Sequence, residues 1–225
     1  MYHAGVKANT LERATLRDHA RVAIRTGVVT GDLEPAALYT IGALAVQLGV
    51  SATPVRDALS DLASDGLIRV IPSRGFIVPP VSARDLDEIF ELRLVLEVPA
   101  VGLAAGRLDE VGHGACRDYV EQGRAAAVAG DLALFLEFDV EFHRQLLLPL
   151  GNQRLIEIIE KLRVQTRLYG LPRLAAENLL TTAANEHKML LEAVAAGDAK
   201  SAREQMSLHL RHTRGSWAGE PEPAR

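Results

Sequence analysis

Residues 48–80 read LGVSATPVRDALSDLASDGLIRVIPSRGFIVPP, and this stretch decides the fold of the first third of the chain. Pro54 suits the first turn of a helix that runs to about Asp65, and Gly66 ends that helix. Two β-rich runs follow, LIRVI and FIVPP, and the turn sequence PSRG between them predicts a small hairpin. The stretch therefore predicts a helix followed directly by a two-stranded hairpin.

Two more helices are predicted before this stretch. Thr15 is a suitable N-cap for a helix over 16–29, and Thr40 for a short helix over 41–48. The predicted element order is helix, short helix, four-residue turn, helix and hairpin. This is the order found in a winged helix-turn-helix. We assign this DNA-binding fold to residues 10–80.

The chain after residue 80 is predicted to be entirely helical. Glycine and proline residues divide it into six segments of helical character, at about 82–107, 109–129, 131–149, 153–169, 174–196 and 199–214. Pro99 should kink or restart the first of them. We therefore expect a mainly α protein, with the winged helix-turn-helix followed by an all-α antiparallel six-helix bundle over residues 81–214. The tail over 215–225 is rich in Pro, Gly and Glu and is expected to be disordered.

Composition excludes several classes of protein. Apolar residues make up 48% of the 225 residues, yet no stretch is apolar for long enough to span a membrane, and the N-terminus lacks a signal-peptide core. Cys116 is the only cysteine, so no intrachain disulfide can form. The net charge is −4, but residues 1–80 hold 8 Lys+Arg and 7 Asp+Glu, a net charge of +1. We expect a cytoplasmic protein whose DNA contacts come from locally placed arginines.

The third predicted helix carries a candidate DNA-reading face. Arg56 shares this face with Thr53 and Ser60, at helical offsets of 3 and 4, while the apolar residues of the helix share the opposite face. Arginine can hold guanine through two hydrogen bonds, and hydroxyl groups can hold phosphates. Arg74 and Gly75 lie at the hairpin tip, where a wing could place a cation in the minor groove. The alternative is an amphipathic surface helix with a solvated arginine.

Four polar residues interrupt the apolar stripes of the predicted bundle helices: Asp139, His143, His187 and His209. Asp139 and His143 lie one helical turn apart on one face, and the other two lie on separate helices. Burying these groups is costly unless they bind something, and one carboxylate with three imidazoles suits a divalent metal. Zn²⁺ is the favoured ion, and Ni²⁺, Co²⁺ and Mn²⁺ also suit these ligands. The alternative for a single histidine is an ordinary hydrogen-bonded core residue.

A small anion is expected beside this metal. Four protein ligands leave positions open on a five- or six-coordinate ion, and a small carboxylate or hydroxy-acid effector could fill them. Arg93 shares a buried face with Ile89 and Leu96, and a buried guanidinium demands a partner. That partner is either Glu97, one turn further along, or the carboxylate of the effector.

The string LGVSATPVRDALSDLASDGLIRVIPSRGFIVPPVS resembles the winged helix of the GntR superfamily. The segments DLDEIFELRLVLE, DVEFHRQLL, LGN, EHKMLLEAVAAGD and MSLHL resemble the FCD effector-binding domain of its FadR subfamily, in the shorter, VanR-like branch with six helices. The likeness covers about residues 16–214. It implies a homodimeric, metabolite-responsive transcriptional regulator that binds double-stranded palindromic operator DNA and is not an enzyme.

The resemblance also implies roles for single residues. The family's DNA-binding positions, including two in the wing, fall in this chain on Ser51, Thr53, Arg56, Arg74 and Gly75. The Asp and three His of the FCD metal site match the four residues that interrupt the bundle stripes. Many members have Arg at position 52, where this chain has Ala52, so one DNA contact and the operator sequence are expected to differ.

Two other functions would use the same metal ligands. An open metal site could activate water in a metal-dependent hydrolase. Against this, Glu141 and Glu186 each neighbour a ligand in sequence, which turns them off its helix face, so no general base is clearly placed. The bundle could also hold a purely structural metal and serve only for dimerisation.

Overall fold

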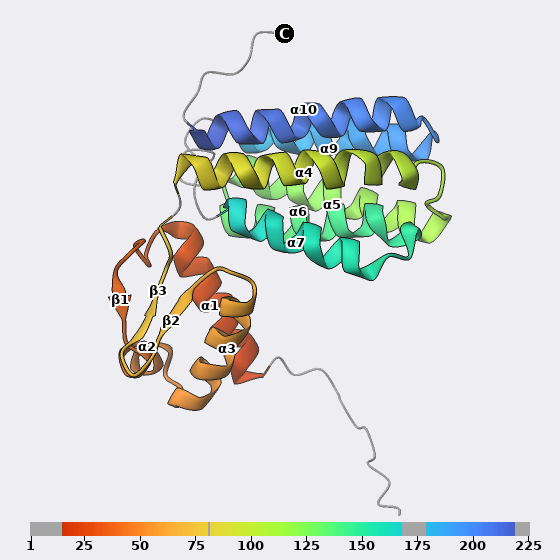
Figure 1. Ribbon diagram of the computed structural model, residues 1–225. Coiled ribbons are helices and arrows are strands. Elements are labelled where there is room, and N and C mark those ends of the chain that lie inside the picture. Colours follow the sequence, from red (N-terminus) through yellow and green to blue (C-terminus); the bar gives the residue numbers. More distant parts are fainter. Residues whose placement is uncertain (1–14, 81, 168–178, 219–225) are drawn as a thin grey trace, which may run out of the picture.

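The computed structural model describes residues 15–80, 82–167 and 179–218. Within these ranges the chain forms a small winged helix-turn-helix module and a helical bundle, joined by the segment between β3 and α4 (Figure 1). No helix in the described ranges is long and apolar enough to cross a membrane.

The first module contains three helices and three short strands in the predicted order. They are α1 (Leu16–Thr30), β1 (Leu38–Tyr39), α2 (Ile41–Leu48), α3 (Ala52–Ser64), β2 (Arg69–Ile71) and β3 (Gly75–Ile77). The strands form an antiparallel sheet in the order β1-β3-β2. The sequence predicted the β2–β3 hairpin but missed β1, because a strand of two residues carries no alternating pattern. The hairpin is also shorter than predicted, since Pro79 and Pro80 have no N–H to donate to a ladder.

The core of this module forms where α1 and α3 pack against the sheet. Phe76 on β3 is fully buried, and its ring stacks on Tyr39 at a centroid distance of 5.6 Å. Ile24 from α1 and Leu62 from α3 are also fully buried in the same cluster. The apolar face of α3 is therefore committed to the core, which fixes its polar face outward.

Helix caps determine where α1 and α4 begin. Thr15 and Asp18 form a capping box, in which each side chain bonds the backbone N–H of the other residue. Ser82 and Asp85 repeat this arrangement at the start of the bundle. The N-cap at Thr15 is confirmed as the sequence predicted it.

The described residues of the second module form six α-helices. They are α4 (Ala83–Ala104), α5 (Glu110–Ala129), α6 (Leu132–Leu147), α7 (Gln153–Arg167), α9 (Leu179–Ala195) and α10 (Ala199–Ala218), with a 3₁₀ turn, η1 (Leu148–Leu150), after α6. Residues 174–178 of the predicted fifth helix lie outside the described residues, as does the predicted tail from residue 219. The last helix continues to Ala218 instead of ending at about 214.

Pro99 does not restart α4, which is one continuous helix from Ala83 to Ala104. Proline removes one helical hydrogen bond, but Pro99 lies on an exposed face of α4. Its ring therefore displaces no side chain of the bundle core, and the helix continues through it.

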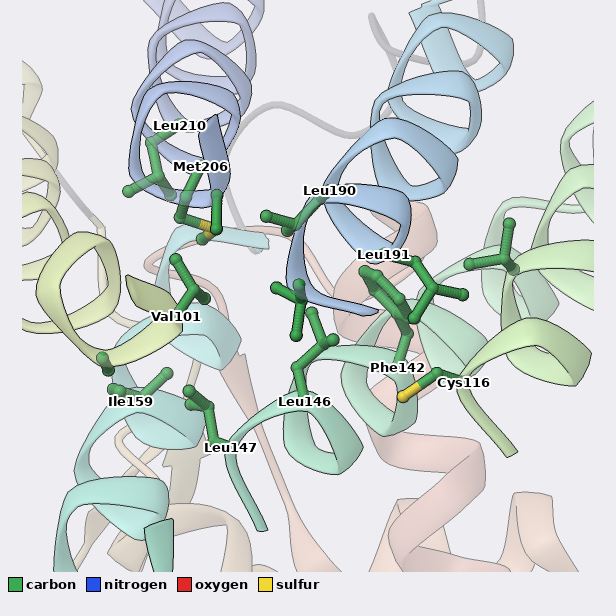
Figure 2. Close-up of a cluster of buried hydrophobic side chains, with 14 of the residues drawn as sticks. Val101, Cys116, Phe142, Leu146, Leu147, Ile159, Leu190, Leu191, Met206 and Leu210 are labelled. Atoms are coloured by element: carbon green, nitrogen blue, oxygen red, sulfur yellow. The ribbon is translucent and has the colours of Figure 1, made fainter. Parts of the chain in front are cut away.

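The bundle core is built from side chains of α4, α5, α6, α7, α9 and α10, and Figure 2 shows them meeting between the helices. Phe142, Leu146, Leu190 and Met206 are fully buried there. Cys116 is part of this cluster, and burial raises the pKa of its thiol to about 12. It therefore packs as a small apolar residue, protonated at neutral pH.

The last turn of α7 connects the bundle to the winged module. Val164 packs against the core cluster of the winged module, and the Gln165 side chain lies against Gly66, just beyond α3. Arg25 on α1 and Asp65 form an ion pair at 3.7 Å on the same side of the winged module. The end of α7 is thus in direct contact with the module that carries α3.

Replacing Gly75 with alanine should destabilise the protein. Gly75 has a φ of +139°, and an added Cβ would lie 2.0 Å from the carbonyl oxygen of Tyr39. We expect Gly75→Ala to lower the free energy of unfolding by more than about 1 kcal/mol, as measured by urea denaturation. In the control Gly42→Ala, which has open space around an exposed helical position, stability should rise by roughly 0.5–1 kcal/mol. Equal stability of the two variants would contradict this account of the wing.

Candidate functional site

Four polar side chains converge in the centre of the bundle. Asp139 and His143 come from α6, His187 from α9 and His209 from α10, and all four residues are at least 93% buried. Each offers one ligand atom, and these atoms all lie within 4.8 Å of one another. The structure thus brings together the whole set that the stripe interruptions indicated, while metal binding by the set stays a prediction.

The distances within this cluster suit a shared cation. His143 Nε2 lies 3.2 Å from His187 Nε2, and Asp139 Oδ1 lies 3.2 Å from His187 Nε2 and 3.7 Å from His143 Nε2. His209 Nε2 is buried and has no hydrogen-bond partner among the residues that the structure describes. A single proton can serve only one of the short contacts, whereas a metal ion accepts lone pairs from all these atoms at once.

The protonation state of the histidines also fits metal ligation. Burial holds the pKa of His143 well below its ordinary value, and the nearby Arg163 guanidinium lowers it further. Burial lowers the pKa of His209 as well, although Glu186 acts in the opposite direction. Both imidazoles are therefore neutral at neutral pH, which is the form that binds a metal.

A buried ionic network adjoins the cluster. Glu97 accepts hydrogen bonds from Arg93 Nε at 2.6 Å and from Arg163 Nη1 at 2.6 Å. Arg163 Nη2 also donates to Asp139 Oδ2 at 2.9 Å. This last bond holds one oxygen of Asp139 and leaves the other, Oδ1, facing the histidines. The network joins α4, α7 and α6.

Arg93 has the first of the two partners that the sequence allowed. Its guanidinium pairs with Glu97, and Thr166 Oγ1 lies 3.4 Å from its Nη1. Burial lowers the pKa of Arg93 to about 10, so the side chain is still charged at neutral pH. Burial alone would raise the pKa of Glu97, but the two guanidinium groups more than offset this and lower it. The effector-binding role of Arg93 stays a prediction.

Two residues of this site were missed by sequence reasoning. Arg163 follows Ile156 and Ile159 on the buried face of α7, so the stripe rule that selected the histidines also applies to it. Glu186 was set aside because it neighbours His187, yet its carboxylate lies 2.8 Å from His209 Nδ1 and contacts His212 Nδ1. On a helix with a wide buried face, two consecutive residues can both point into the core. Being next to His187 in the sequence therefore did not exclude Glu186 from the site.

Four of the five predicted DNA-reading residues lie on the surface of the winged module. Thr53, Arg56 and Ser60 are exposed on one face of α3, and Ser51 is the N-cap residue, with no capping hydrogen bond from its side chain. Arg74 is exposed at the tip of the hairpin. Gly75 is buried, and the close approach of the Tyr39 carbonyl gives it a conformational role. DNA contact by these residues stays a prediction.

Two family profiles match the chain. Residues 16–78 match the family described as bacterial regulatory proteins, gntR family, and residues 88–212 match the FCD domain. The first range covers the winged module and the second spans α5, α6, α7, α9 and most of α4 and α10.

Similar proteins include named regulators. An HTH-type transcriptional regulator in an unstable DNA locus of Streptomyces ambofaciens is 31% identical over 208 residues, which is 91% of this chain and 85% of that protein. The HTH-type transcriptional regulator McbR of Escherichia coli is 36% identical over 135 residues, 60% of this chain and 61% of that protein. The solved structure of E. coli McbR/YncC superimposes with a TM-score of 0.77 at 28% identity, covering 92% of this chain and 99% of that one.

Removing two of the imidazoles should abolish metal binding. We expect wild-type protein to bind about one Zn²⁺ per chain and to gain thermal stability from it. His187→Ala combined with His209→Ala should bind none and show no such gain, as measured by elemental analysis and thermal melting. His19→Ala is the control, because His19 is exposed on α1. Unchanged metal content in the double variant would disprove the four-ligand site.

Proposed function

The chain belongs to the GntR family of bacterial regulatory proteins, in the branch that carries an FCD domain, and from that premise we propose that a divalent metal and a small organic acid bind in its bundle and control its affinity for operator DNA. It is a transcriptional regulator with a DNA-binding helix-turn-helix and an FCD effector domain, and it is not an enzyme. The observation that carries the proposal is the buried convergence of one carboxylate and three imidazoles.

The metal would be held by Asp139, His143, His187 and His209. Three nitrogen ligands and one oxygen ligand favour Zn²⁺, and Ni²⁺, Co²⁺ or Mn²⁺ fit the same set. When bound, the ion supplies a concentrated positive charge to which an anionic ligand can be attracted. The similarity to bacterial regulatory proteins and to a named transcriptional regulator argues against the hydrolase alternative.

The charge balance of the buried site supports an acidic effector. Arg93 and Arg163 carry two positive charges, and Glu97 and Asp139 carry two negative charges, so the network is neutral before a metal enters. Glu186 adds a buried carboxylate beside His209, so a divalent ion with neutral histidines leaves an excess of one positive charge in a buried place. A small carboxylate or hydroxy-acid reduces that excess, and the two guanidinium groups are donors suited to its oxygens.

Helix α7 supplies a route from this site to the winged module. Arg163 and Thr166 face the ionic network, while Val164 between them packs against the core of the winged module. A change in the partners of Arg163 would therefore act on the helix turn that supports α3. The effect on DNA binding can be no larger than the difference in acid affinity between the two states.

The exposed side of α4 supports assembly as a homodimer. Leu92, Val95 and Leu103 are 50%, 69% and 59% exposed, and together with the exposed Pro99 they form one apolar stripe at helical offsets of 3, 4 and 4. A second copy of the chain would cover this stripe by symmetry. Two winged modules in such a dimer would read two half-sites, which makes the operator palindromic.

The DNA-reading face predicts a clear mutational result. We expect Arg56→Ala to weaken binding to operator DNA by about 1–3 kcal/mol without changing the melting temperature. The operator would be selected from random-sequence duplexes, and binding measured by fluorescence anisotropy at fixed salt. Arg124→Ala is the control, because Arg124 is exposed on α5 in the bundle. Failure of the wild-type protein to select any duplex, with and without metal, would reject the proposed function.

The acid response should depend on the guanidinium of Arg93. With Zn²⁺-loaded protein, we expect at least one of acetate, succinate, malate and citrate to change operator affinity by about 5- to 150-fold. Arg93→Lys keeps the charge but loses the planar fork, so this response should shrink. Arg84→Lys, an exposed position on the same helix, should behave like the wild type. If Zn²⁺ raises the melting temperature while no acid changes operator affinity, the metal is purely structural.

A further inference from the structure

Glu186 has a position that neither the metal cluster nor the DNA-binding face explains. It lies on α9 beside His187 and is only 8% exposed. Its side chain reaches α10, where Oε2 lies 2.8 Å from His209 Nδ1 and Oε1 contacts His212 Nδ1. Both oxygens of the carboxylate are thus directed at imidazoles of the neighbouring helix.

The contact with Oε2 determines which nitrogen of His209 carries the proton. A carboxylate can only accept hydrogen bonds, so the imidazole Nδ1 must donate. A neutral ring with hydrogen on Nδ1 has its lone pair on Nε2. In His209 that Nε2 atom is buried with no hydrogen-bond partner in the described part of the chain, while the ring centroid lies 4.8 Å from that of His187 and 5.3 Å from that of His143. The ring is therefore oriented with its lone pair available to the cluster.

We propose that Glu186 is a positioning residue that fixes the ring and tautomer of His209 and thereby sets the metal affinity of the bundle. This inference rests on the proposed metal function. Glu186 is not itself a ligand, because one of its oxygens accepts from His209 Nδ1, opposite the Nε2 atom, and the other contacts His212 Nδ1. A ligating histidine whose other nitrogen donates to a carboxylate is held in one orientation and is a stronger ligand.

His212 has a supporting part in this arrangement. Its side chain is 18% exposed, and it occupies the second oxygen of Glu186 at the partly exposed edge of the site. With one oxygen on each imidazole, the carboxylate plane cannot rotate away from His209 without losing a contact. His212 lies three residues after His209 on α10, and its contact with Glu186 gives it a use other than metal ligation.

Metal affinity is the first measurement. Zn²⁺ affinity would be determined by competition with a chromophoric chelator for wild-type protein, Glu186→Ala and Glu186→Gln. We expect Glu186→Ala to bind Zn²⁺ about 10- to 100-fold more weakly. Glu186→Gln should lose less, because its amide oxygen can still accept one Nδ1–H bond. The control is Glu192→Gln, an exposed position on α9, and melting of the metal-free variants checks that they fold.

The second measurement reports the tautomer directly and needs no metal. Ring-nitrogen NMR of the metal-free protein should find His209 with hydrogen on Nδ1 in the wild type, and a mixed or reversed tautomer in Glu186→Ala. Hydrogen on Nε2 in the wild type, or an unchanged tautomer in the variant, would overturn the inference. If wild-type protein takes up no Zn²⁺, the proposed function fails. If it takes up Zn²⁺ and Glu186→Ala binds it equally well, only the role of Glu186 fails.

Discussion

The two bonds that Arg163 donates, to Glu97 and to Asp139, are the constraint on which the bundle depends. These three residues are almost completely excluded from water, so each charge must be balanced by its neighbours. Arg93 completes the balance on α4. Buried ion pairs add little net stability, but a missing partner is strongly destabilising. The network therefore fixes how α4, α6 and α7 pack together, and it holds Asp139 in the orientation in which its second oxygen faces the histidines.

Much of this architecture follows from sequence patterns. Caps, glycine breaks and the hairpin turn predicted the winged module and the six bundle helices, because these signals are local. The four clustered residues were found because each interrupts an apolar stripe, and the cost of burying a polar group makes such an interruption informative. The three-dimensional convergence of α6, α9 and α10 then placed them within reach of one another.

What escaped prediction depends on contacts between distant segments. Strand β1 exists only because β3 supplies its ladder. Glu186 lies beside His187 in the sequence, but its partners are on α10, and no local pattern names them. The competition between Glu97 and an effector for Arg93 could likewise not be decided from spacing, since both are compatible with a buried guanidinium. For β1 and Glu186 the deciding interaction is a tertiary contact, whereas Arg93 and Glu97 are partners one turn apart on α4.

In the wing, the residue on which the hairpin fold depends and the residue exposed at its tip are different. Gly75 is locked against the Tyr39 carbonyl, whereas the adjacent Arg74 is exposed at the tip. Substitutions of Arg74 therefore change the surface that the hairpin tip presents while the hairpin stays folded. Substitutions of Gly75 disturb the hairpin itself. If Arg74 contacts DNA as proposed, its replacement would change the preferred operator sequence at little cost to the folding of the hairpin.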